Sequence, residues 1–401
     1  MPDAILVVNA GSSSLKFSAF APADNQDPVL LFKGQIEGIG TRPRFIARDA
    51  RGAALAETRY EAKEVSGHDA AIGLLSGWLR AMAGRPRLIA VGHRVAHGGA
   101  DFEAPIVIDD GVLQSLQKIV PLVPLHQPAN LAAIRAVRTH QPHLPQVACF
   151  DTAFHRGHPD LADRYALPEE LYREGVRRYG FHGLSYEYIA RALPTAAPEI
   201  AAGRVVVAHL GSGASMCAMK AGRSLDSTMG FSALDGLPMG TRCGNIDPGV
   251  LLYLMREKQM STEEIEQLLY KECGLRGLSG VSNDVRDLLA SSDPSAKRAL
   301  DYFVYHACRQ LGSLAAVLGG LDGFVFTAGI GEHSPELRAR ICKAAAWLGI
   351  SLDEEANRSR RPRITKLESR VSAWVIPTDE EMTIARHTLE LIYPRQGAKA
   401  H

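Results

Sequence analysis

Residues 5–17, with the sequence ILVVNAGSSSLKF, combine an apolar strand, a turn of glycine and serine, and the start of a second strand. A turn of this kind directs several backbone N–H groups toward one anion. Asn9 adds a neutral oxygen, the serines add hydroxyl groups and Lys16 adds a cation. These are the groups that a phosphate chain and its metal ion require. A single turn of this composition is more often an ordinary hairpin, so a phosphate site needs support from elsewhere in the chain.

Two other stretches repeat the pattern. Residues 204–215, RVVVAHLGSGAS, and residues 323–332, GFVFTAGIGE, each run from an apolar strand into a turn rich in glycine. The chain contains neither the G-x-x-x-x-G-K-[ST] pattern of P-loop proteins nor the G-x-G-x-x-G pattern of dinucleotide-binding domains. The repeated strand-turn-strand unit, near residue 10 and near residue 211, instead predicts two related α/β domains that each offer a turn to one nucleotide.

The chain of 401 residues is too long for one comfortable core, which supports two domains. We expect residues 1–150 to form the first α/β domain and the closing helix, residues 381–401, to complete it. Residues 151–380 are expected to form the second α/β domain, which carries most of the nucleotide site. Strands and helices alternate along both parts.

The expected strands are residues 4–9, 15–20, 29–36, 88–94, 146–150, 204–210, 215–219, 323–327 and 371–376. The expected helices are residues 127–139, 185–193, 248–258, 262–273, 294–318, 335–347 and 379–393. Ser261 and Glu264 form a capping box at the start of one helix. Ser334 is the expected N-cap of another, with Pro335 in its first position.

The composition excludes several classes of partner. Hydrophobic residues make up 46% of the chain, and 45 basic and 44 acidic residues give a formal charge of +1. Nucleic acid and membrane partners are therefore not expected. No apolar run reaches the roughly 18 residues of a membrane span, and we expect no signal peptide, because the first 20 residues already contain strand and turn residues. The six scattered cysteines contain no C-x-x-C pair, so we expect reduced thiols, no zinc site and a cytoplasmic location.

Several charged and imidazole side chains lie on loops bracketed by glycine or proline. They occur in GHRVAHGG (92–99), PLHQP (124–128), ACFDTAFH (148–155), YGFHG (179–183) and MGTRCGNIDP (239–248). Taken singly, a strand-end Asp is usually a helix cap, a lone His is usually structural and an isolated Arg is usually a surface residue. The number of such residues is more informative than any one of them, because α/β proteins place their catalytic and binding residues on loops at strand ends.

These motifs give the chain a resemblance to the acetate kinase family. NAGSSSLK, GHRVAHGG, PLHQP, FDTAFH, RYGFHG, HLGSGAS, MGTRCGNIDP, SNDVR, TAGIGE and PTDEE occur in the family's order over nearly the full length. The resemblance implies the duplicated fold shared with sugar kinases, actin and the chaperone ATPases. It also implies a homodimer that transfers the γ-phosphoryl group of ATP directly to acetate. Mg²⁺ is the implied metal, with Mn²⁺ as an alternative, and the products are acetyl phosphate and ADP.

The resemblance assigns binding roles residue by residue. Asn9 and Glu380 are the implied pair at the metal, and Ser12, Ser14 and Lys16 face the phosphates. The second phosphate turn comprises His209, Leu210, Gly211, Ser212 and Gly213. The residues beside the ribose and adenine are Asp284, Val285 and Arg286. A last segment closes over the nucleotide, and it consists of Gly329, Ile330, Gly331, Glu332 and His333.

The resemblance also assigns the chemistry. Arg94 holds the substrate carboxylate, and Arg242 bridges that carboxylate and the transferring phosphoryl group, since guanidinium groups donate in a planar fork. His182 and His126 donate to the equatorial oxygens of the transferring group. Asp151 is the family's catalytic carboxylate. Acetate is already ionised at neutral pH, so we interpret Asp151 as a positioning residue rather than a general base.

Four residues depart from the family pattern. Ser212 and His333 replace asparagines at turns beside the nucleotide, which affects donor preference and affinity. Ala96 replaces a valine and Ala233 a proline in the pocket for the acyl methyl group, whose other walls are Leu125 and Phe181. Two smaller side chains leave room beyond a methyl group, unless neighbouring side chains repack into the space.

Three alternatives stay open at this point. The chain could be a broader kinase of short-chain acids such as propionate, or it could use pyrophosphate as donor. Asp284 and Arg286 favour a nucleotide over pyrophosphate. From another class, an ATP-binding switch like actin or the chaperone ATPases would also use the two phosphate turns. Arg94, His182 and Arg242 argue against a switch, which has no need of a carboxylate clamp.

Overall fold

The computed structural model describes residues 2–23 and 26–393, and the chain divides into two compact units. Unit 1 comprises Met1–Phe154 together with the segment that starts at Asp379. Unit 2 comprises His155–Thr378. The last part of the expected closing helix, residues 394–401, lies outside the described residues. A 3₁₀ turn, Ala153–His155, spans the point where the chain passes from unit 1 into unit 2.

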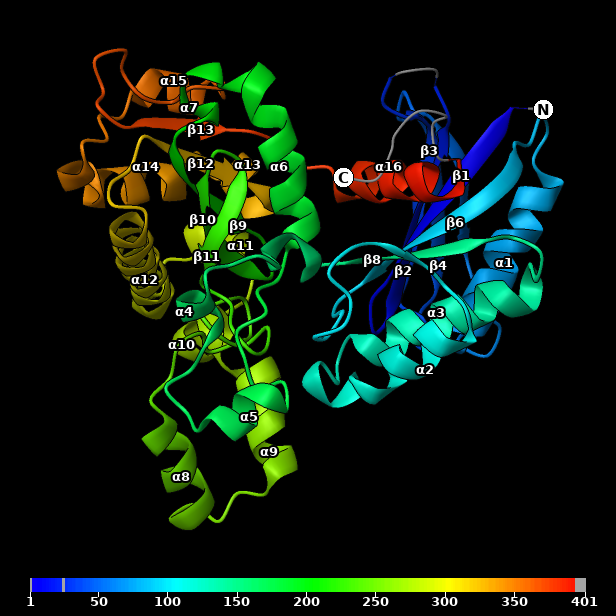
Figure 1. Cartoon of the computed structure of the whole chain (residues 1–401), viewed down its shortest axis with the longest axis horizontal. Helices are drawn as coiled ribbons and strands as arrows, with labels where there is room; N and C mark the ends of the chain where they lie inside the picture. Colours follow the sequence, from blue (N-terminus) through cyan, green and yellow to red (C-terminus); the bar gives the residue numbers. More distant parts are fainter. Residues whose placement is uncertain (1, 24–25, 394–401) are drawn as a thin grey trace. The chain divides into compact units, whose positions relative to one another are not determined.

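Unit 1 is built on an eight-stranded sheet with the strand order β5-β4-β3-β2-β1-β6-β8-β7 (Figure 1). Its strands are β1 (Asp3–Ala10), β2 (Ser14–Ala21), β3 (Val29–Glu37), β4 (Arg44–Asp49), β5 (Ala54–Arg59), β6 (Arg87–Val95), β7 (Ile106–Val107) and β8 (Gln146–Phe150). Its helices are α1 (His68–Ala81), α2 (Asp110–Lys118), α3 (Gln127–His140) and α16 (Glu380–Ile392), with a 3₁₀ turn at Val120–Leu122.

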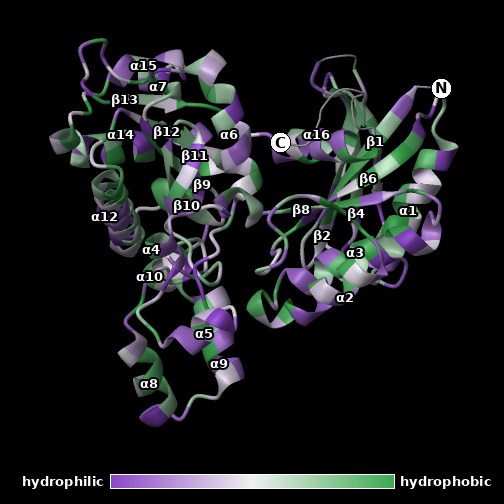
Figure 2. Ribbon diagram, in the orientation of Figure 1, coloured by the Kyte–Doolittle hydropathy of each residue, from purple (hydrophilic) through white to green (hydrophobic). Residues whose placement is uncertain are grey.

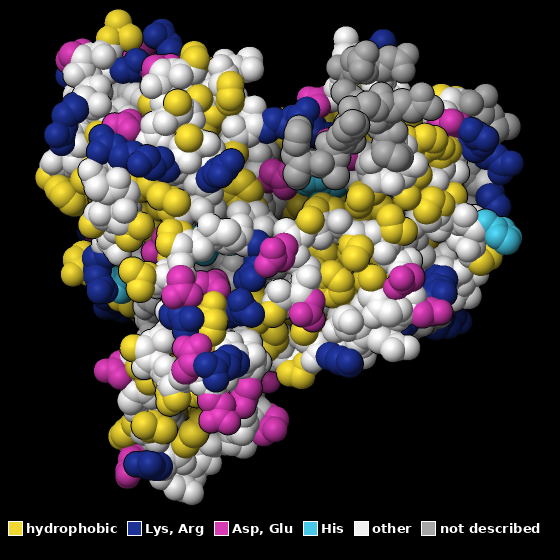
Figure 3. All heavy atoms as spheres, in the orientation of Figure 1, with side chains coloured by type: hydrophobic (Ala, Val, Ile, Leu, Met, Phe, Trp, Pro, Cys, Tyr) yellow, Lys and Arg dark blue, Asp and Glu magenta, His cyan; other side chains and the backbone are white. Residues whose placement is uncertain are grey.

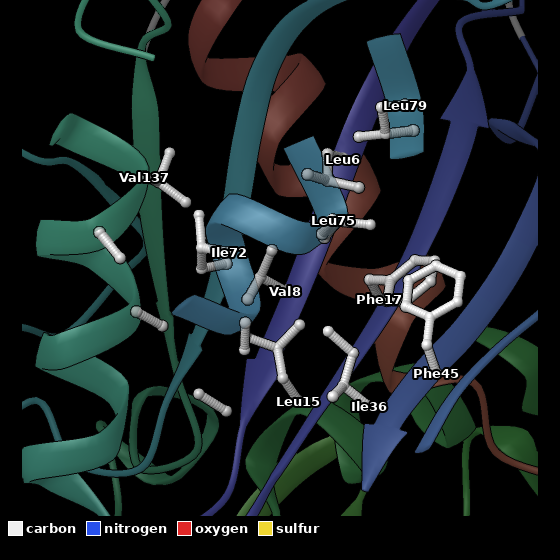
Figure 4. Close-up of a cluster of buried hydrophobic side chains, with 14 of the residues drawn as sticks. Leu6, Val8, Leu15, Phe17, Ile36, Phe45, Ile72, Leu75, Leu79 and Val137 are labelled. Atoms are coloured by element: carbon white, nitrogen blue, oxygen red, sulfur yellow. The ribbon is translucent and has the colours of Figure 1, made fainter. Parts of the chain in front are cut away.

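Helices cover both faces of the central strands of unit 1. Val91 of β6 belongs to the cluster of buried side chains that includes Ile72 of α1 and Val137 of α3 (Figure 4). The next residue, Gly92, points to the opposite face, because successive side chains of a strand alternate. A Cβ atom at Gly92 would overlap Thr388 and Ile384 of α16. Helix α16 therefore lies directly on the backbone of β6, and glycine is what allows this approach.

The apolar core of unit 1 follows from the residue pattern of its first hairpin. Phe17 of β2 stacks on Phe45 of β4 with ring centroids 5.6 Å apart, and Trp78 of α1 packs against both rings. Leu15 and Ile36, on neighbouring strands, extend this layer (Figure 4). Burial of each such side chain contributes about 1.5–3 kcal/mol, so this layer fixes the hairpin on which the Gly-Ser turn is carried.

Unit 2 is built on a five-stranded sheet with the strand order β11-β10-β9-β12-β13 (Figure 1). Its strands are β9 (Arg204–Leu210), β10 (Ala214–Lys220), β11 (Arg223–Ser227), β12 (Gly323–Thr327) and β13 (Ser372–Val375). The helices before α12 are α4 (Asp160–Asp163), α5 (Glu169–Arg173), α6 (Gly183–Ala196), α7 (Pro198–Ala201), α8 (Pro248–Arg256), α9 (Thr262–Gln267), a π-helical segment (Leu268–Glu272), α10 (Gly274–Ser279) and α11 (Val285–Ala290). The others are α12 (Pro294–Val317), α13 (Ala328–His333), α14 (Pro335–Ala344), a 3₁₀ turn (Ala346–Leu348) and α15 (Glu354–Arg358).

The two expected strand-turn-strand units are both present. In unit 1, β1 pairs antiparallel with β2 and parallel with β6. In unit 2, β9 pairs antiparallel with β10 and parallel with β12. The capping box of Ser261 and Glu264 and the N-cap Ser334 are confirmed. The repeated pairing scheme is what relates the two units.

The structure corrects the sequence analysis at the third glycine-rich stretch. Residues 328–333 do not form an open turn after β12 but the short helix α13. Its first residue, Ala328, has a φ of 63°, and its N–H donates to Glu332 Oε1 at 2.9 Å. The Glu332 carboxylate thus closes the segment into a helical turn, a contact that glycine content alone does not reveal. The helix expected at 262–273 is likewise divided, since α9 ends at Gln267.

Helix α8 has an apolar surface that is exposed to solvent. In Figure 2 most of it is coloured as hydrophobic, yet none of its residues is buried. Among residues 2–23 and 26–393, no helix combines the length and apolar character that crossing a bilayer requires.

Candidate active site

Three parallel strands of unit 1 end at chemically active residues. Val8 of β1 is in register with His93 of β6, and Arg94 of β6 is in register with Cys149 of β8. The residues that follow in this register are Asn9 at the end of β1 and Asp151 directly after β8. The carboxyl ends of adjacent parallel strands meet at one edge of a sheet, which is where α/β proteins bind ligands. The topology therefore gathers Asn9, Arg94 and Asp151 at one edge of unit 1.

Arg94 contacts two carboxylates from different parts of unit 1. Its Nη2 donates to Asp151 Oδ2 at 2.8 Å, and its Nε lies 3.1 and 3.2 Å from the two Asp151 oxygens. Its Nη1 lies 3.3 Å from Oε2 of Glu380, in the first turn of α16. Asp151 is 4% exposed, so the fork is largely shielded from water. The guanidinium group thus joins the expected catalytic carboxylate to one of the two expected metal ligands.

At Asp151 and at Arg94, burial and the charge of the other residue shift the pKa in opposite directions. Burial raises the pKa of Asp151 to about 6; Arg94 acts in the opposite direction, and the nearby Glu380 adds to the rise. Burial alone would lower the pKa of Arg94, but Asp151 and Glu380 together raise it. Arg94 therefore stays cationic, and Asp151 is held in place chiefly by that cation.

The first phosphate turn is closed by backbone contacts. Gly11 N donates to Ser14 O at 2.8 Å, and the carbonyl oxygen of Gly11 lies 2.8 Å from Nε2 of His68. Asn9 is directly opposite Lys16 in the β1–β2 register. Directly opposite residues lie on the same face of a sheet, so the amide and the ammonium group are neighbours. Ser12 and Lys16 are exposed to solvent.

A residue that the sequence analysis missed fixes the segment after β6. Asn130 of α3 accepts a hydrogen bond from the backbone N–H of Ala96 at 2.9 Å and donates to the carbonyl of Ala10 at 2.8 Å. Asn130 is 5% exposed, and its one sequence signal is an amide on the mostly apolar buried face of the helix. His126 and Leu125 lie in the turn that leads into the same helix, both partly buried.

In unit 2, the second phosphate turn meets the expected catalytic residues. A Cβ atom built on Gly213 would lie 2.8 Å from Nη2 of Arg242 and 3.2 Å from Nε2 of His182. Arg242 is held by its Nη1, which donates to the carbonyl oxygen of Ala233 at 2.7 Å. Burial lowers the pKa of Arg242 below its ordinary value. Because position 213 carries no side chain, the guanidinium, the imidazole and the turn can approach one another.

His182 has an uncommon backbone conformation. Its φ of 58° lies in the left-handed region, immediately before α6. A residue other than glycine in this region costs free energy and usually marks a functional constraint. Its ring stacks on that of His209 with centroids 4.1 Å apart and an interplanar angle of 15°. Nδ1 of His182 lies 2.8 Å from Ser215 Oγ, and Nδ1 of His209 lies 2.8 Å from Ser185 Oγ. Phe181, the preceding residue, is buried.

The expected ribose and adenine residues occupy the start of α11. Asp284 caps this helix by accepting from Arg286 N at 2.8 Å, and its carboxylate also binds the Arg286 guanidinium at 2.6 Å. The side chains of Val285 and Leu210 are buried in unit 2. These two residues can therefore reach a nucleotide only through their backbone atoms.

The segment expected to close over the nucleotide is held by Glu332. Besides Ala328 N–H, its Oε1 accepts the N–H of Thr378 at 3.2 Å. Glu332 thus has a structural role in shaping α13. Gly329 and His333 are exposed at the two ends of this short helix, whereas Gly331 is buried.

Each of the two α/β units carries a hairpin of the phosphate-binding type. Arginines, histidines and a buried carboxylate accompany these hairpins. This combination defines a phosphotransferase of the duplicated actin-like ATPase fold. The sequence profile of the acetokinase family matches residues 4–386, which is nearly the whole chain. The chain belongs to the acetokinase family.

Individual relatives agree with this assignment. The chain is 58% identical over 396 residues to an acetate kinase of Nitrobacter hamburgensis, covering 99% of this chain and 98% of the relative. An acetate kinase of Rhizobium meliloti is 54% identical over 390 residues, with 97% and 98% covered.

Solved structures give the same result for the fold. An acetate kinase from Porphyromonas gingivalis superposes with a TM-score of 0.85 at 34% identity, covering 97% of this chain and 100% of that one. A propionate kinase from Francisella tularensis gives a TM-score of 0.90 at 35% identity, with 97% and 99% covered. The predicted family, the duplicated α/β fold and the kinase class are thereby confirmed.

Proposed function

We propose that the protein is an acetate kinase, which reversibly transfers the γ-phosphoryl group of ATP to acetate and gives acetyl phosphate and ADP. The observation that carries the proposal is the meeting of Gly213, Arg242 and His182 in unit 2. A phosphate turn beside a cation and an imidazole suits a group that carries negative charge on three oxygens. The acetate kinases among the relatives support acetate as the acceptor.

The chemistry requires alignment and charge neutralisation more than proton transfer. Acetate is ionised at neutral pH and can attack the phosphorus without a base. Arg242 neutralises charge as the two anions approach, and His182 donates a hydrogen bond to an equatorial oxygen. Arg94 attracts the acetate carboxylate, while Asp151 fixes the orientation of Arg94. Direct in-line transfer between held partners accounts for the reaction.

The residues at the edge of unit 1 suit Mg²⁺. Asn9 offers an amide oxygen and Glu380 a carboxylate, and Mg²⁺ prefers such hard oxygen ligands together with waters and substrate phosphates. Within the described ranges, no group of three or more His, Cys, Asp or Glu side chains could hold a metal ion. A site with few protein ligands is typical of Mg²⁺ that arrives with a nucleotide. The ion would neutralise phosphate charge there, and Mn²⁺ uses the same ligands.

The remaining expected residues receive nucleotide-binding roles in this proposal. Ser12, Ser14 and Lys16 are assigned to the phosphates, and so is the turn after β9. Asp284 and Arg286 flank the ribose and adenine. Ser212, in the turn after β9, and His333, at the end of α13, are both exposed and set the preference among donors.

A hydroxylamine trap tests the proposed function directly. Purified protein with ATP, Mg²⁺ and acetate should give acetyl hydroxamate in an amount that depends on all three. Arg242→Ala should lower the rate by about 10² or more, the scale of losing a charge-stabilising group. Arg173→Ala, an exposed arginine on α5, is the matched control and should keep the wild-type rate. ATP hydrolysis without acetate-dependent hydroxamate would instead support the ATP-driven switch.

A broader acid specificity has support of its own. Ala96 and Ala233 are small residues at the two positions expected to line the acyl pocket. A propionate kinase superposes on this chain, which supports the longer acid as a second substrate. We therefore include propionate as a second substrate, to be separated from acetate by kinetics.

The surface of α8 supports a homodimer. Figure 3 shows hydrophobic side chains gathered over this helix. The exposed apolar residues there are Ile246, Val250, Leu252, Tyr253 and Met255. We propose that a second copy of the chain covers them. Light scattering should give the mass of a dimer, and Leu252→Glu should give a monomer. Leu161→Glu, at an exposed leucine of α4, is the control that should remain dimeric.

We also infer a cytoplasmic location. All six cysteines are free thiols in the structure, and they lie in both units. Reduced thiols are typical of the compartment that also supplies ATP. Fractionation of cells that make the protein would test this location.

A further inference from the structure

A chain of buried polar groups runs behind His182 in unit 2. Tyr186 of α6 and Ser215 of β10 are both 0% exposed. The Tyr186 hydroxyl lies 2.6 Å from Ser215 Oγ, and Ser215 Oγ lies 2.8 Å from Nδ1 of His182. Neither residue was singled out by the sequence, and neither has a role in the reaction described above. Buried polar groups of this kind are satisfied by hydrogen bonds, so their proton positions can be worked out.

We propose that Ser215 and Tyr186 are positioning residues that hold His182 in the tautomer with its proton on Nε2. This proposal deepens the proposed function, because it assigns the residues that prepare His182 for its role as a donor.

The proton positions follow from the donors and acceptors available. A phenol hydroxyl is more acidic than an aliphatic hydroxyl, so it is the better hydrogen-bond donor and the weaker acceptor. The Tyr186 hydroxyl lies 2.6 Å from the aliphatic hydroxyl of Ser215. Tyr186 therefore donates to Ser215. Ser215 has one hydroxyl proton of its own, which it donates to Nδ1 of His182. An imidazole that accepts at Nδ1 carries its proton on Nε2 when neutral.

The proton on Nε2 is placed where the reaction needs a donor. Nε2 of His182 is the ring atom that faces Gly213, at 3.2 Å from the position of a Cβ on that glycine. In this tautomer the ring presents N–H to an anionic phosphoryl oxygen. The other tautomer would present a lone pair to the same oxygen and repel it. Fixing the proton before substrate binds avoids any rearrangement during transfer.

The neighbouring ring is held by different groups. Ser185 donates to Thr378 Oγ1 at 2.9 Å, so its oxygen accepts from Nδ1 of His209. The two stacked rings thus have opposite tautomers, each set by its own serine. This contrast indicates that the proton position at His182 is a local property of Ser215 and Tyr186 rather than of the stack.

The direct test is the tautomer itself. In protein labelled with ¹⁵N at histidine, the ring nitrogens of His182 are assigned by comparison with His182→Gln. The wild type should show the pattern of a neutral ring protonated on Nε2, and Ser215→Ala should show a mixture of both tautomers. A wild-type ring protonated on Nδ1 would overturn the proposal. This measurement needs no turnover, so its failure is distinguishable from failure of the proposed acetate kinase activity.

Kinetics give the second test. Ser215→Ala should lower kcat by about 10–100-fold, with both KM values within about threefold of wild type, because the lost interaction serves the transition state. Tyr186→Phe should lower kcat by about 3–10-fold, since Ser215 keeps its hydroxyl but loses the group that orients it.

The matched control is Ser224→Ala. Ser224 is also buried in unit 2 and also bonds to histidines, at 2.9 Å from Nδ1 of His155 and 2.7 Å from Nε2 of His158. Its loss should leave kcat within about twofold of wild type even if the melting temperature falls. Equal loss of kcat in Ser224→Ala and Ser215→Ala would show a general effect of packing and overturn the positioning role.

Discussion

Arg94 and Asp151 form a bidentate pair in which Nη2 lies 2.8 Å from Oδ2 and Nε lies 3.1 Å from the same oxygen. The remaining nitrogen, Nη1, reaches Glu380 at 3.3 Å. Every nitrogen of the guanidinium group is thus engaged by the protein's own carboxylates. In the proposed mechanism an incoming acetate must compete with them, so Arg94 would link the proposed acceptor site to the proposed metal site.

Removal of the Asp151 carboxylate should strongly lower the rate of phosphoryl transfer. We expect Asp151→Ala to lower kcat by about 10² or more, because Arg94 loses the partner that orients it. Steady-state kinetics with acetate, ATP and Mg²⁺ measure the loss. Asp322→Ala is the matched control, since Asp322 forms a similar fork with Arg204, at the opposite end of β9 from the phosphate turn. Near-normal turnover of Asp151→Ala would refute the assigned role.

The acyl pocket can be tested with two acids. One buried methylene contributes about 0.8 kcal/mol, and a discriminating pocket separates homologues by roughly 1–3 kcal/mol. With alanine at positions 96 and 233, we expect kcat/KM for propionate within about tenfold of acetate, a gap of about 1.4 kcal/mol. Ala96→Val should shift the preference toward acetate by narrowing the pocket. A wild type that prefers acetate by about a hundredfold or more would mean that neighbouring side chains have filled the space.

Gly213→Ala should disturb catalysis without unfolding unit 2. The added Cβ would lie 2.8 Å from Arg242 and 3.2 Å from His182, so both side chains must shift. We expect kcat to fall by about tenfold or more, since a displacement of about 1 Å among aligned reacting groups strongly lowers the rate of the chemical step.

Gly77→Ala in α1 is the control for that change. A Cβ at this position meets no atom within 4 Å. Activity should be unchanged, and stability should rise by up to about 1 kcal/mol from the better helix propensity of alanine. If Gly213→Ala were as active as Gly77→Ala, the three groups in unit 2 would not act together.

Acid should destabilise the protein through two buried histidines. Burial lowers the pKa of His155 to about 3 and that of His158 to about 4, against 6.5 for an unperturbed imidazole. The unfolded chain therefore binds protons that the folded chain does not between pH 6.5 and pH 4. The contribution to stability is complete above pH 6.5 and is lost as the pH falls, at up to about 1.4 kcal/mol per pH unit for each histidine.

A comparison of variants isolates this effect from other titrating groups. Urea unfolding at pH 7.5 and pH 5 should show a smaller loss of stability on acidification in His158→Gln than in the wild type. Identical pH dependence in the two proteins would show that His158 titrates in the folded state as it does in the unfolded chain.

The sequence predicted the parts of the fold that depend on local patterns. The hairpins near residues 10 and 211 were predicted because an apolar strand, a Gly-Ser turn and a second strand occur in direct succession. The edge strand β5 was missed, because all but one of its residues are exposed and the apolar alternation that marks a strand is lacking. Residues 328–333 were misjudged as a turn, because the contact from Glu332 that closes α13 depends on tertiary placement.

For the candidate site, too, the sequence predicted some residues and missed others. Residues that carry charge on glycine-bracketed loops, such as Arg94 and Arg242, were identified from the motifs. The residues that hold them were not. Asn130 bonds to groups 34 and 120 residues away in the chain. Periodicity indicates which face of a helix is buried, but not which buried polar groups meet there.

Helix α16 makes the order of synthesis matter for the proposed metal ligands. Ser18 Oγ donates to Glu381 at 2.8 Å across 363 residues of sequence, and Glu380 is the adjacent residue. A ribosome adds roughly 5–20 residues per second, and domains generally fold as they emerge. All of unit 2 is made before α16 can cover Gly92 and deliver Glu380 to the edge that holds Asn9. A nascent or truncated chain that stops short of residue 379 therefore carries an unfinished first unit, and it lacks one of the two proposed metal ligands until translation is nearly complete.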